Sequence, residues 1–107
     1  MASKAEFVTY AAEQMKDAGQ ITCRKMFGDY GVYCDGKIFG LICDDQLFIK
    51  ITEEGRKVCP NLQEAPPYEG AKPHFLVDEL DDRELMTRLV RETVRVLPEP
   101  KKRKKKK

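Results

Sequence analysis

The sequence lacks several features that define large classes of proteins. It contains no tryptophan and one histidine, and it has no apolar run near the roughly 20 residues that a membrane-spanning helix requires. The N-terminal segment, residues 1–6, lacks the apolar stretch of a secretory signal. We therefore expect a cytoplasmic protein without membrane contact, in which thiols stay reduced.

The motifs of common catalytic and metal sites are also missing. The sequence has no P-loop, no G-x-G-x-x-G fingerprint and no G-x-S-x-G nucleophile motif. Its cysteines, Cys23, Cys34, Cys43 and Cys59, are separated by 11, 9 and 16 positions rather than paired as C-x-x-C, which favours buried thiols over zinc ligands. We interpret His74, in its apolar context, as a packed or surface residue rather than a general base. We therefore assign no catalytic group, metal or cofactor to these residues, and we expect a protein that is not an enzyme.

Charge is distributed unevenly along the chain. The 107 residues include 20 Lys and Arg and 18 Asp and Glu, but the last seven residues are all basic. Residues 1–100 therefore hold 13 basic and 18 acidic side chains, a net charge of −5. We expect one domain over residues 1–100 and a polybasic tail over residues 101–107, which like-charge repulsion keeps disordered when it is unbound.

Helix signals occur near the start of the chain and in one short central segment. Ser3 and Glu6 have the spacing of a capping box, which predicts that a helix begins there, and Gly19 is typical of a residue that follows a last turn. Thr52 can cap a short helix that reaches about Cys59. Two helices are therefore expected before the last third of the chain.

A third helix is predicted near the C-terminus. Apolar residues recur at helical spacing from Leu85 to Leu97, and Pro98 ends the pattern. An acidic cluster precedes it, and we interpret this cluster as helix-capping and dipole-matching charges rather than as a metal site. The cluster consists of Asp78, Glu79, Asp81 and Asp82.

The middle of the chain is rich in β-branched and aromatic residues. Asp35-Gly36 is a favoured two-residue hairpin turn, and Asp44-Asp45 indicates a second reversal. The predicted strands cover residues 21–27, 30–34, 37–43, 46–51 and 74–77. The expected fold class is α+β, in two layers: an antiparallel sheet of about five strands, packed with N- and C-terminal helices and one short helix.

Two tight turns fix an expected strand register, with Val32 opposite Phe39 and Leu41 opposite Phe48. In this register both faces of the sheet are apolar, so the second face needs a cover. A helix or the proline-rich connection of the same chain can supply it, or a second subunit can. We interpret the second face as a partner-binding surface formed by Tyr30, Val32, Phe39, Leu41 and Phe48.

The basic C-terminal end suggests a different kind of partner. Arg88, Arg91 and Arg95 recur on one stripe of the last helix, although Glu84 and Glu92 can neutralise part of it and leave a plain solvated face. The tail can bind phosphates of nucleic acid without base readout, since it carries no aromatic residue for stacking. Its basic residues are Lys101, Lys102, Arg103, Lys104, Lys105, Lys106 and Lys107.

Three segments resemble a known family. These are RKMFGDYGVYCDGK at residues 24–37, LICDDQLFIK at 41–50 and PPYEGAKP at 66–73. Together they resemble the N-terminal domain of the TfoX/Sxy competence-regulator family, over nearly residues 1–100. Asp29 stands where many members have a second glycine, which indicates a turn variant. The motif residues of the first segment are Arg24, Met26, Phe27, Gly28, Gly31, Tyr33, Asp35 and Gly36.

The resemblance implies a two-layer α+β domain of the bacterial cytoplasm, linked to the regulation of DNA-uptake genes. Full-length members act with a cyclic-AMP receptor transcription factor and carry a second, helical domain, which this sequence does not contain. No catalytic residue is carried over. We expect a regulatory or protein-interaction domain that binds another protein or a second copy of itself. The alternative is an accessory protein that binds nucleic acid nonspecifically through its basic end.

Overall fold

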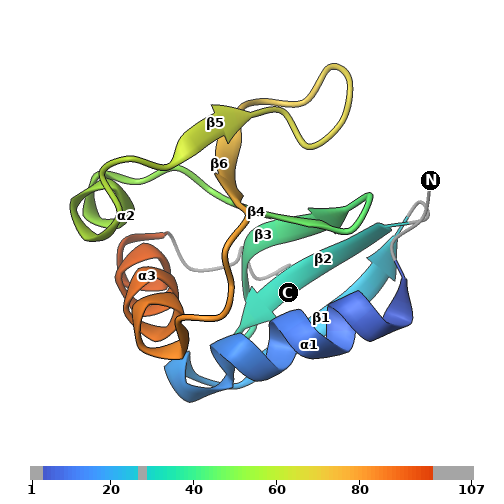
Figure 1. Cartoon of the computed structure of the whole chain (residues 1–107), viewed down its shortest axis with the longest axis horizontal. Coiled ribbons are helices and arrows are strands. Elements are labelled where there is room, and N and C mark those ends of the chain that lie inside the picture. Colours follow the sequence, from blue (N-terminus) through green and yellow to red (C-terminus); the bar gives the residue numbers. More distant parts are fainter. Residues whose placement is uncertain (1–3, 27–28, 98–107) are drawn as a thin grey trace, which may run out of the picture.

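The computed structural model describes residues 4–26 and 29–97 of the chain. The order of elements is α1 (Ala5–Met15), a 3-10 turn (Lys16–Ala18), β1 (Ile21–Met26), β2 (Asp29–Cys34), β3 (Lys37–Cys43), β4 (Gln46–Ile49), α2 (Glu53–Val58), β5 (Gln63–Ala65), β6 (His74–Val77) and α3 (Arg83–Val96). All strands form one antiparallel sheet in the order β1-β2-β3-β4-β6-β5 (Figure 1). The α+β class is confirmed, with six strands in the described residues where about five were expected.

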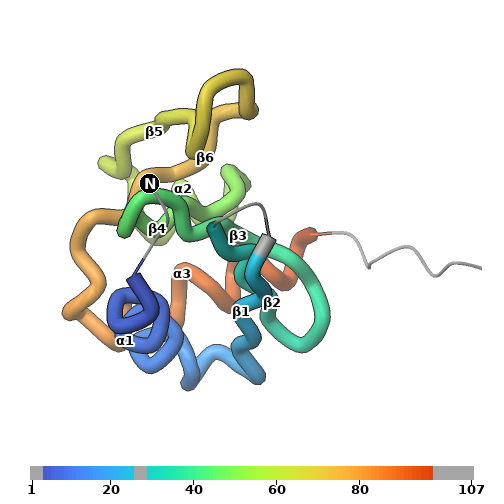
Figure 2. The backbone as a smooth tube through the Cα atoms, turned by 90° about the vertical axis from the view of Figure 1, so that its right-hand side faces the viewer, coloured from blue at the N-terminus to red at the C-terminus, as the bar shows by residue number. Residues whose placement is uncertain are grey.

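The helices α1 and α3 pack against one face of the sheet. In Figure 2 they lie below β4 and β6 and to one side of β1 and β2, so that the sheet bends around them. Buried side chains from both helices and the strands form one apolar core. This core includes Val8, Ala11 and Met15 of α1, Met86, Leu89 and Val90 of α3, and Ile42, Leu47, Ile49, Phe75 and Val77 of the sheet.

The two predicted reversals are confirmed. Asp35 and Gly36 have φ angles of 52° and 89°, and Asp44 and Asp45 have φ angles of 54° and 58°. Positive φ at both central residues is the geometry of a tight hairpin turn whose twist matches that of the strands. Aspartate tolerates this region better than most residues because its short side chain can form hydrogen bonds locally.

Two of the three described helices, α2 and α3, begin at predicted capping residues, and α1 does not. Thr52 accepts a hydrogen bond from the Gly55 amide at 2.9 Å, and Asp82 accepts one from the Leu85 amide at 3.1 Å. At the start of α1 the N-cap is Lys4, whose side chain makes no capping hydrogen bond. The helix therefore begins one residue later than the capping box predicts, and Ser3, the capping residue of that prediction, lies outside the described residues. The polybasic tail, residues 101–107, also lies outside them.

The register prediction is correct near the turn between β2 and β3 and wrong beyond it. Tyr33 pairs with Ile38 as expected, but Val32 pairs with Gly40 rather than with Phe39. One extra residue, Phe39, is accommodated in β3 as a β-bulge, which shifts the alternation of faces along the rest of that strand. The pairing of β3 with β4 is as predicted, including Leu41 opposite Phe48.

At Gly40, the residue that follows Phe39, β4 lies very close to β3. A Cβ atom on Gly40 would lie 2.4 Å from the Phe48 carbonyl oxygen, which no side chain could tolerate without a backbone shift. The amide of Lys50 donates a hydrogen bond of 2.8 Å to the carbonyl oxygen of Phe39, so the bulged residue is still tied to the neighbouring chain segment. Phe39 itself is fully buried in the core.

Candidate interaction surfaces

The face of the sheet opposite α1 and α3 is largely apolar. Register places Leu41 beside Phe48, and Phe48 beside Leu76, so one apolar row crosses three strands. Leu47 and Ile49, which flank Phe48 in β4, belong to the core. Because successive side chains of a strand point to opposite faces, Phe48 and its row lie on the face away from the core. We call this surface the outer sheet face. It consists of Tyr33, Ile38, Leu41, Phe48 and Leu76.

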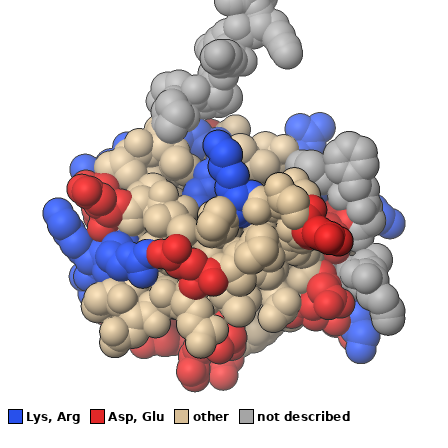
Figure 3. Space-filling view, turned by 90° about the horizontal axis from the view of Figure 1, so that it is seen from above, with Lys and Arg blue, Asp and Glu red and all other residues tan. Residues whose placement is uncertain are grey.

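The residues of the outer sheet face differ in exposure. Phe48 is 3% exposed, whereas its two neighbours in the row, Leu41 and Leu76, are half-buried, as are Tyr33 and Ile38. Figure 3, seen from the side of β5 and β6, shows uncharged side chains across much of the middle of the molecule. The outer sheet face therefore has a buried aromatic centre with half-buried aliphatic groups beside it.

The predicted partner-binding set does not lie on one face. Val32 and Phe39 are 0% exposed and belong to the core, and Tyr30 packs against the same core. Leu41 and Phe48 lie on the outer sheet face. The error follows from the bulge at Phe39, which reverses the alternation that the sequence pattern assumes.

Motif residues shared with the family resemblance lie mainly in the β1–β2–β3 region. Arg24 of β1 lies over the ring of Tyr33, with its guanidinium carbon 5.9 Å from the ring centroid. Gly31 is buried in β2, and Asp35 and Gly36 form the hairpin turn. Met26 ends β1, while Phe27 and Gly28 lie outside the described residues.

The arginines of α3 are mostly engaged with the protein itself. Arg91 donates to the Asp17 carbonyl oxygen at 3.2 Å, and Arg95 forms an ion pair with Glu92 at 2.6 Å. The third predicted residue, Arg88, is exposed. The stripe is therefore not a row of free cations, and the seven basic residues of the tail lie outside the described part of the chain.

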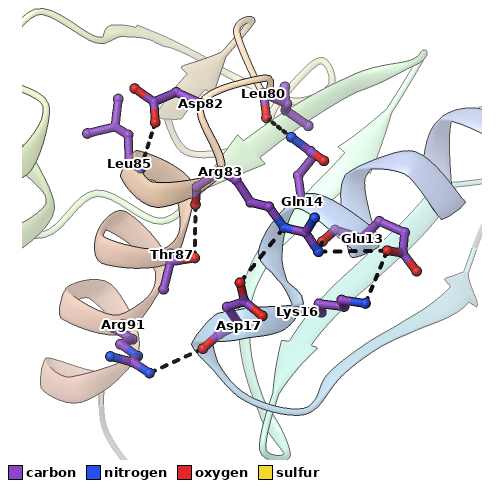
Figure 4. A network of polar contacts seen from close by, with 10 residues as sticks. All are labelled: Glu13, Gln14, Lys16, Asp17, Leu80, Asp82, Arg83, Leu85, Thr87 and Arg91. Carbon is purple, nitrogen blue, oxygen red and sulfur yellow. Dashed lines mark hydrogen bonds and ion pairs between the residues drawn. The ribbon is translucent and has the colours of Figure 1, made fainter.

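A polar network that the sequence pattern did not indicate joins α1 to the start of α3. Arg83 lies between two acidic groups of the α1 segment, 3.8 Å from a carboxylate oxygen of Glu13 and 3.8 Å from one of Asp17 (Figure 4). The amide of Gln14 donates to the Leu80 carbonyl oxygen at 2.6 Å, and the Tyr10 hydroxyl donates to Asp81. These groups are remote in sequence, so only the packing of the two helices brings them together.

The thiols are poorly suited to nucleophilic chemistry. Burial raises the pKa of Cys43 to about 11, with a further contribution from the nearby carboxylates of Asp29 and Asp44. Burial also raises the pKa of each of the other cysteines, Cys23, Cys34 and Cys59. Since the thiolate is the reactive form, all four thiols are less reactive than free cysteine at neutral pH.

The remaining chemical groups give no catalytic arrangement in residues 4–26 and 29–97. His74 is half-buried, and its Nδ1 lies 2.9 Å from the carbonyl oxygen of Lys72. No cluster of three or more potential metal ligands occurs among the described residues. The helices described here are also too short or too polar to cross a membrane.

Comparison with known proteins identifies a family and a relative of this chain. The TfoX N-terminal domain family matches residues 13–97. An uncharacterized 12.7 kDa protein encoded in the trpE 5′ region of Spirochaeta aurantia is 33% identical over 105 residues, which cover 97% of this chain and 91% of that protein. Both matches span the sheet and α3, so they include the whole outer sheet face.

Proposed function

This chain belongs to the TfoX N-terminal domain family, and we propose that it is a non-enzymatic regulatory domain of the bacterial cytoplasm that acts by binding protein. The family resemblance connects such a role with the control of competence genes. The binding surface in this proposal is the outer sheet face. The first partner that it fits is a second copy of the chain, because an isologous contact requires only one self-complementary patch.

The observation that carries the proposal is the apolar row of Leu41, Phe48 and Leu76. Both described long helices pack on the opposite side of the sheet, so this row receives no cover from α1 or α3. Partly exposed leucines on both sides of a buried aromatic residue offer apolar area that association can remove from water, at about 25 cal/mol per Å². Isolated apolar residues on a surface need no explanation, but two half-buried leucines that flank the same aromatic residue on neighbouring strands support an interface.

Self-association can be tested by light scattering of the wild type and of a Leu41→Asp, Leu76→Asp variant. Both substitutions place a charge on half-buried positions and leave Phe48 intact, so the fold should be retained by circular dichroism. Val96→Asp is the matched control, because Val96 is also an exposed apolar residue but lies at the end of α3. We expect dimers for the wild type and the control and monomers for the double variant. A wild type that remains monomeric at all concentrations would contradict the proposal.

A second function rests on the seven consecutive basic residues at positions 101–107. We propose as the alternative that this tail binds the phosphates of nucleic acid without sequence preference. With about seven phosphate contacts on duplex DNA, log K should fall with log salt at a slope of roughly −6. Replacement of all seven residues by glutamine should remove both the binding and this slope. If DNA affinity and slope are unchanged, the alternative fails.

A further inference from the structure

A groove of about 320 Å³ lies at the N-terminal end of α3, between this helix, the end of β6 and the segment that joins α2 to β5. Its inner wall is apolar and includes Leu62, Val77, Leu85 and Met86. Val77 and Met86 are at most 4% exposed, whereas Leu62 and Leu85 are half-buried. The groove therefore offers partly exposed aliphatic surface above a buried floor.

The rim of the groove is acidic. Asp78, Glu79 and Asp82 line it and are exposed. Asp82 caps α3 through the Leu85 amide, while Asp78 and Glu79 form no ion pair with another described residue. Arg88 lies close enough to Cys59, inside the groove, to lower the thiol pKa against the larger opposite effect of burial. Three negative groups and one positive group leave this end of the molecule negative.

An apolar wall below a negative rim fits one kind of side chain well. Lysine and arginine carry a long aliphatic stem that packs against apolar surface, with a charged end group that stays in water. A stem lying along Leu62 and Leu85 would place its ammonium or guanidinium group among the carboxylates of the rim. The groove thus suits a segment with several lysine or arginine residues.

We propose that this groove binds the basic segment Lys101–Lys107 of the same chain. The tail leaves the fold after α3, at the end of the helix that is remote from the groove. A 14-residue helix is about 21 Å long, and residues 98–107 can span at most about 33 Å. The last residues of the tail can therefore reach back along α3 to the rim.

The side chains along this path do not exclude the tail. Arg95, on the last turn of α3, is paired with the carboxylate of Glu92, which reduces its repulsion of passing lysines. Arg91 donates to the backbone carbonyl oxygen of Asp17, which holds its side chain against the α1 segment. The opposite charges of tail and rim supply the attraction, and the short connection keeps the tail at a high local concentration. Occupation of the groove would compete with phosphate binding by the same residues.

The test uses the full chain and carbodiimide, which joins a lysine to a carboxylate that it contacts. We expect intrachain links from residues 101–107 to Asp78 or Glu79 at physiological salt, and their loss in an Asp78→Asn, Glu79→Gln variant. The matched control is Glu53→Gln, Glu69→Gln, which removes two exposed carboxylates elsewhere and should leave the links unchanged. Neither pair contains a helix cap, so all chains should fold.

An NMR comparison gives a second readout on intact chains. Amide signals of residues 59, 78–79 and 85–86 should differ between the wild type and a full-length variant with glutamine at positions 101–107. Signals that do not differ, links spread evenly over Glu53 and Glu69, or links found only between copies would each overturn the proposal. Both measurements are made without DNA, so they decide the occupant of the groove independently of the nucleic-acid function.

Discussion

The ammonium group of Lys37 donates a hydrogen bond to the carbonyl oxygen of Leu97 at 3.0 Å. It also donates to the carbonyl oxygen of Val94 at 3.2 Å. The Val94 carbonyl also accepts from the Leu97 amide at 3.2 Å, so Lys37 adds a second donor there. The cation lies at the negative end of the helix dipole, where carbonyl groups of the last turn lack partners further along the helix. The contact fixes the C-terminal end of α3 against the β2–β3 hairpin.

Replacing Lys37 by methionine should lower the free energy of unfolding by about 0.5–1.5 kcal/mol. Methionine keeps most of the aliphatic volume and removes the donor and the charge. Urea unfolding followed by circular dichroism measures the difference. Lys72→Met, at an exposed position of the β5–β6 loop, is the control and should change stability little. Equal stability of the two variants would show that the contact to Leu97 contributes nothing.

Thr93 of α3 offers a stabilising substitution. Its side chain is 0% exposed, and its hydroxyl has no hydrogen-bond partner within the described residues. An unpaired buried hydroxyl is costly, so Thr93→Val should raise the free energy of unfolding by about 1 kcal/mol. Thr87→Val is the matched control, since the Thr87 hydroxyl donates to the Arg83 carbonyl oxygen at 2.9 Å. A destabilised Thr93→Val variant would mean that the hydroxyl is in fact satisfied.

Gly40 should not accept even a methyl group. The close approach of the Phe48 carbonyl oxygen predicts that Gly40→Ala lowers stability by about 1–3 kcal/mol, as overpacking generally does. Gly36→Asn serves for comparison, because no atom lies within 4 Å of the added Cβ and asparagine tolerates the positive φ of that turn. Thermal unfolding of both variants measures the difference. An alanine at position 40 without effect would contradict the close approach of β4 to Gly40.

Because the pKa of Cys43 is raised in the folded protein, we expect the protein to lose stability at alkaline pH. Its folded pKa of about 11 lies above the unfolded value of 9.0, so the folded state holds the proton more tightly. The thiol therefore makes its full contribution to the free energy of unfolding below pH 9, and this contribution declines as the pH rises towards 11. Cys43→Ala should flatten the decline, measured as the urea midpoint against pH. A wild-type midpoint that stays constant between pH 9 and 11 would contradict the raised pKa.

The same shift predicts slow chemical modification of Cys43. Its folded pKa of about 11, against 9.0 in the unfolded chain, leaves less of the thiol as thiolate at neutral pH, so alkylation should be slower in the folded protein than in the unfolded chain. Iodoacetamide labelling with peptide mass analysis measures the rate at each cysteine. Equal rates in folded and unfolded protein would show that the thiol is neither buried nor shifted.

Local chemistry made much of the fold predictable from the sequence. Asp35-Gly36 and Asp44-Asp45 located both turns, and Thr52 and the acidic cluster before α3 located two helix starts, because each acts on backbone groups within a few residues. The bulge at Phe39 was not predictable, since no residue type near it demands an extra residue in the strand. The polar strand β5 was missed for a related reason: its pairing with β6 exists only in the folded chain.

The candidate surface was predicted in part. Leu41 and Phe48 were identified correctly as neighbours because a two-residue turn sets their register. Leu76 was missed, since it joins them through pairing between β4 and β6, about 30 positions apart in the chain. The groove at α3 was missed because three separate segments line it.

NMR on mixed samples tests the protein-binding role of the outer sheet face most directly. One chain carries labelled leucine methyl groups and the other is unlabelled, so only contacts between two copies give intermolecular NOE signals. We predict such signals from the methyl groups of Leu41 and Leu76 to protons of the partner's outer sheet face. Signals that are absent, or that arise only from leucines of α3, would contradict the account.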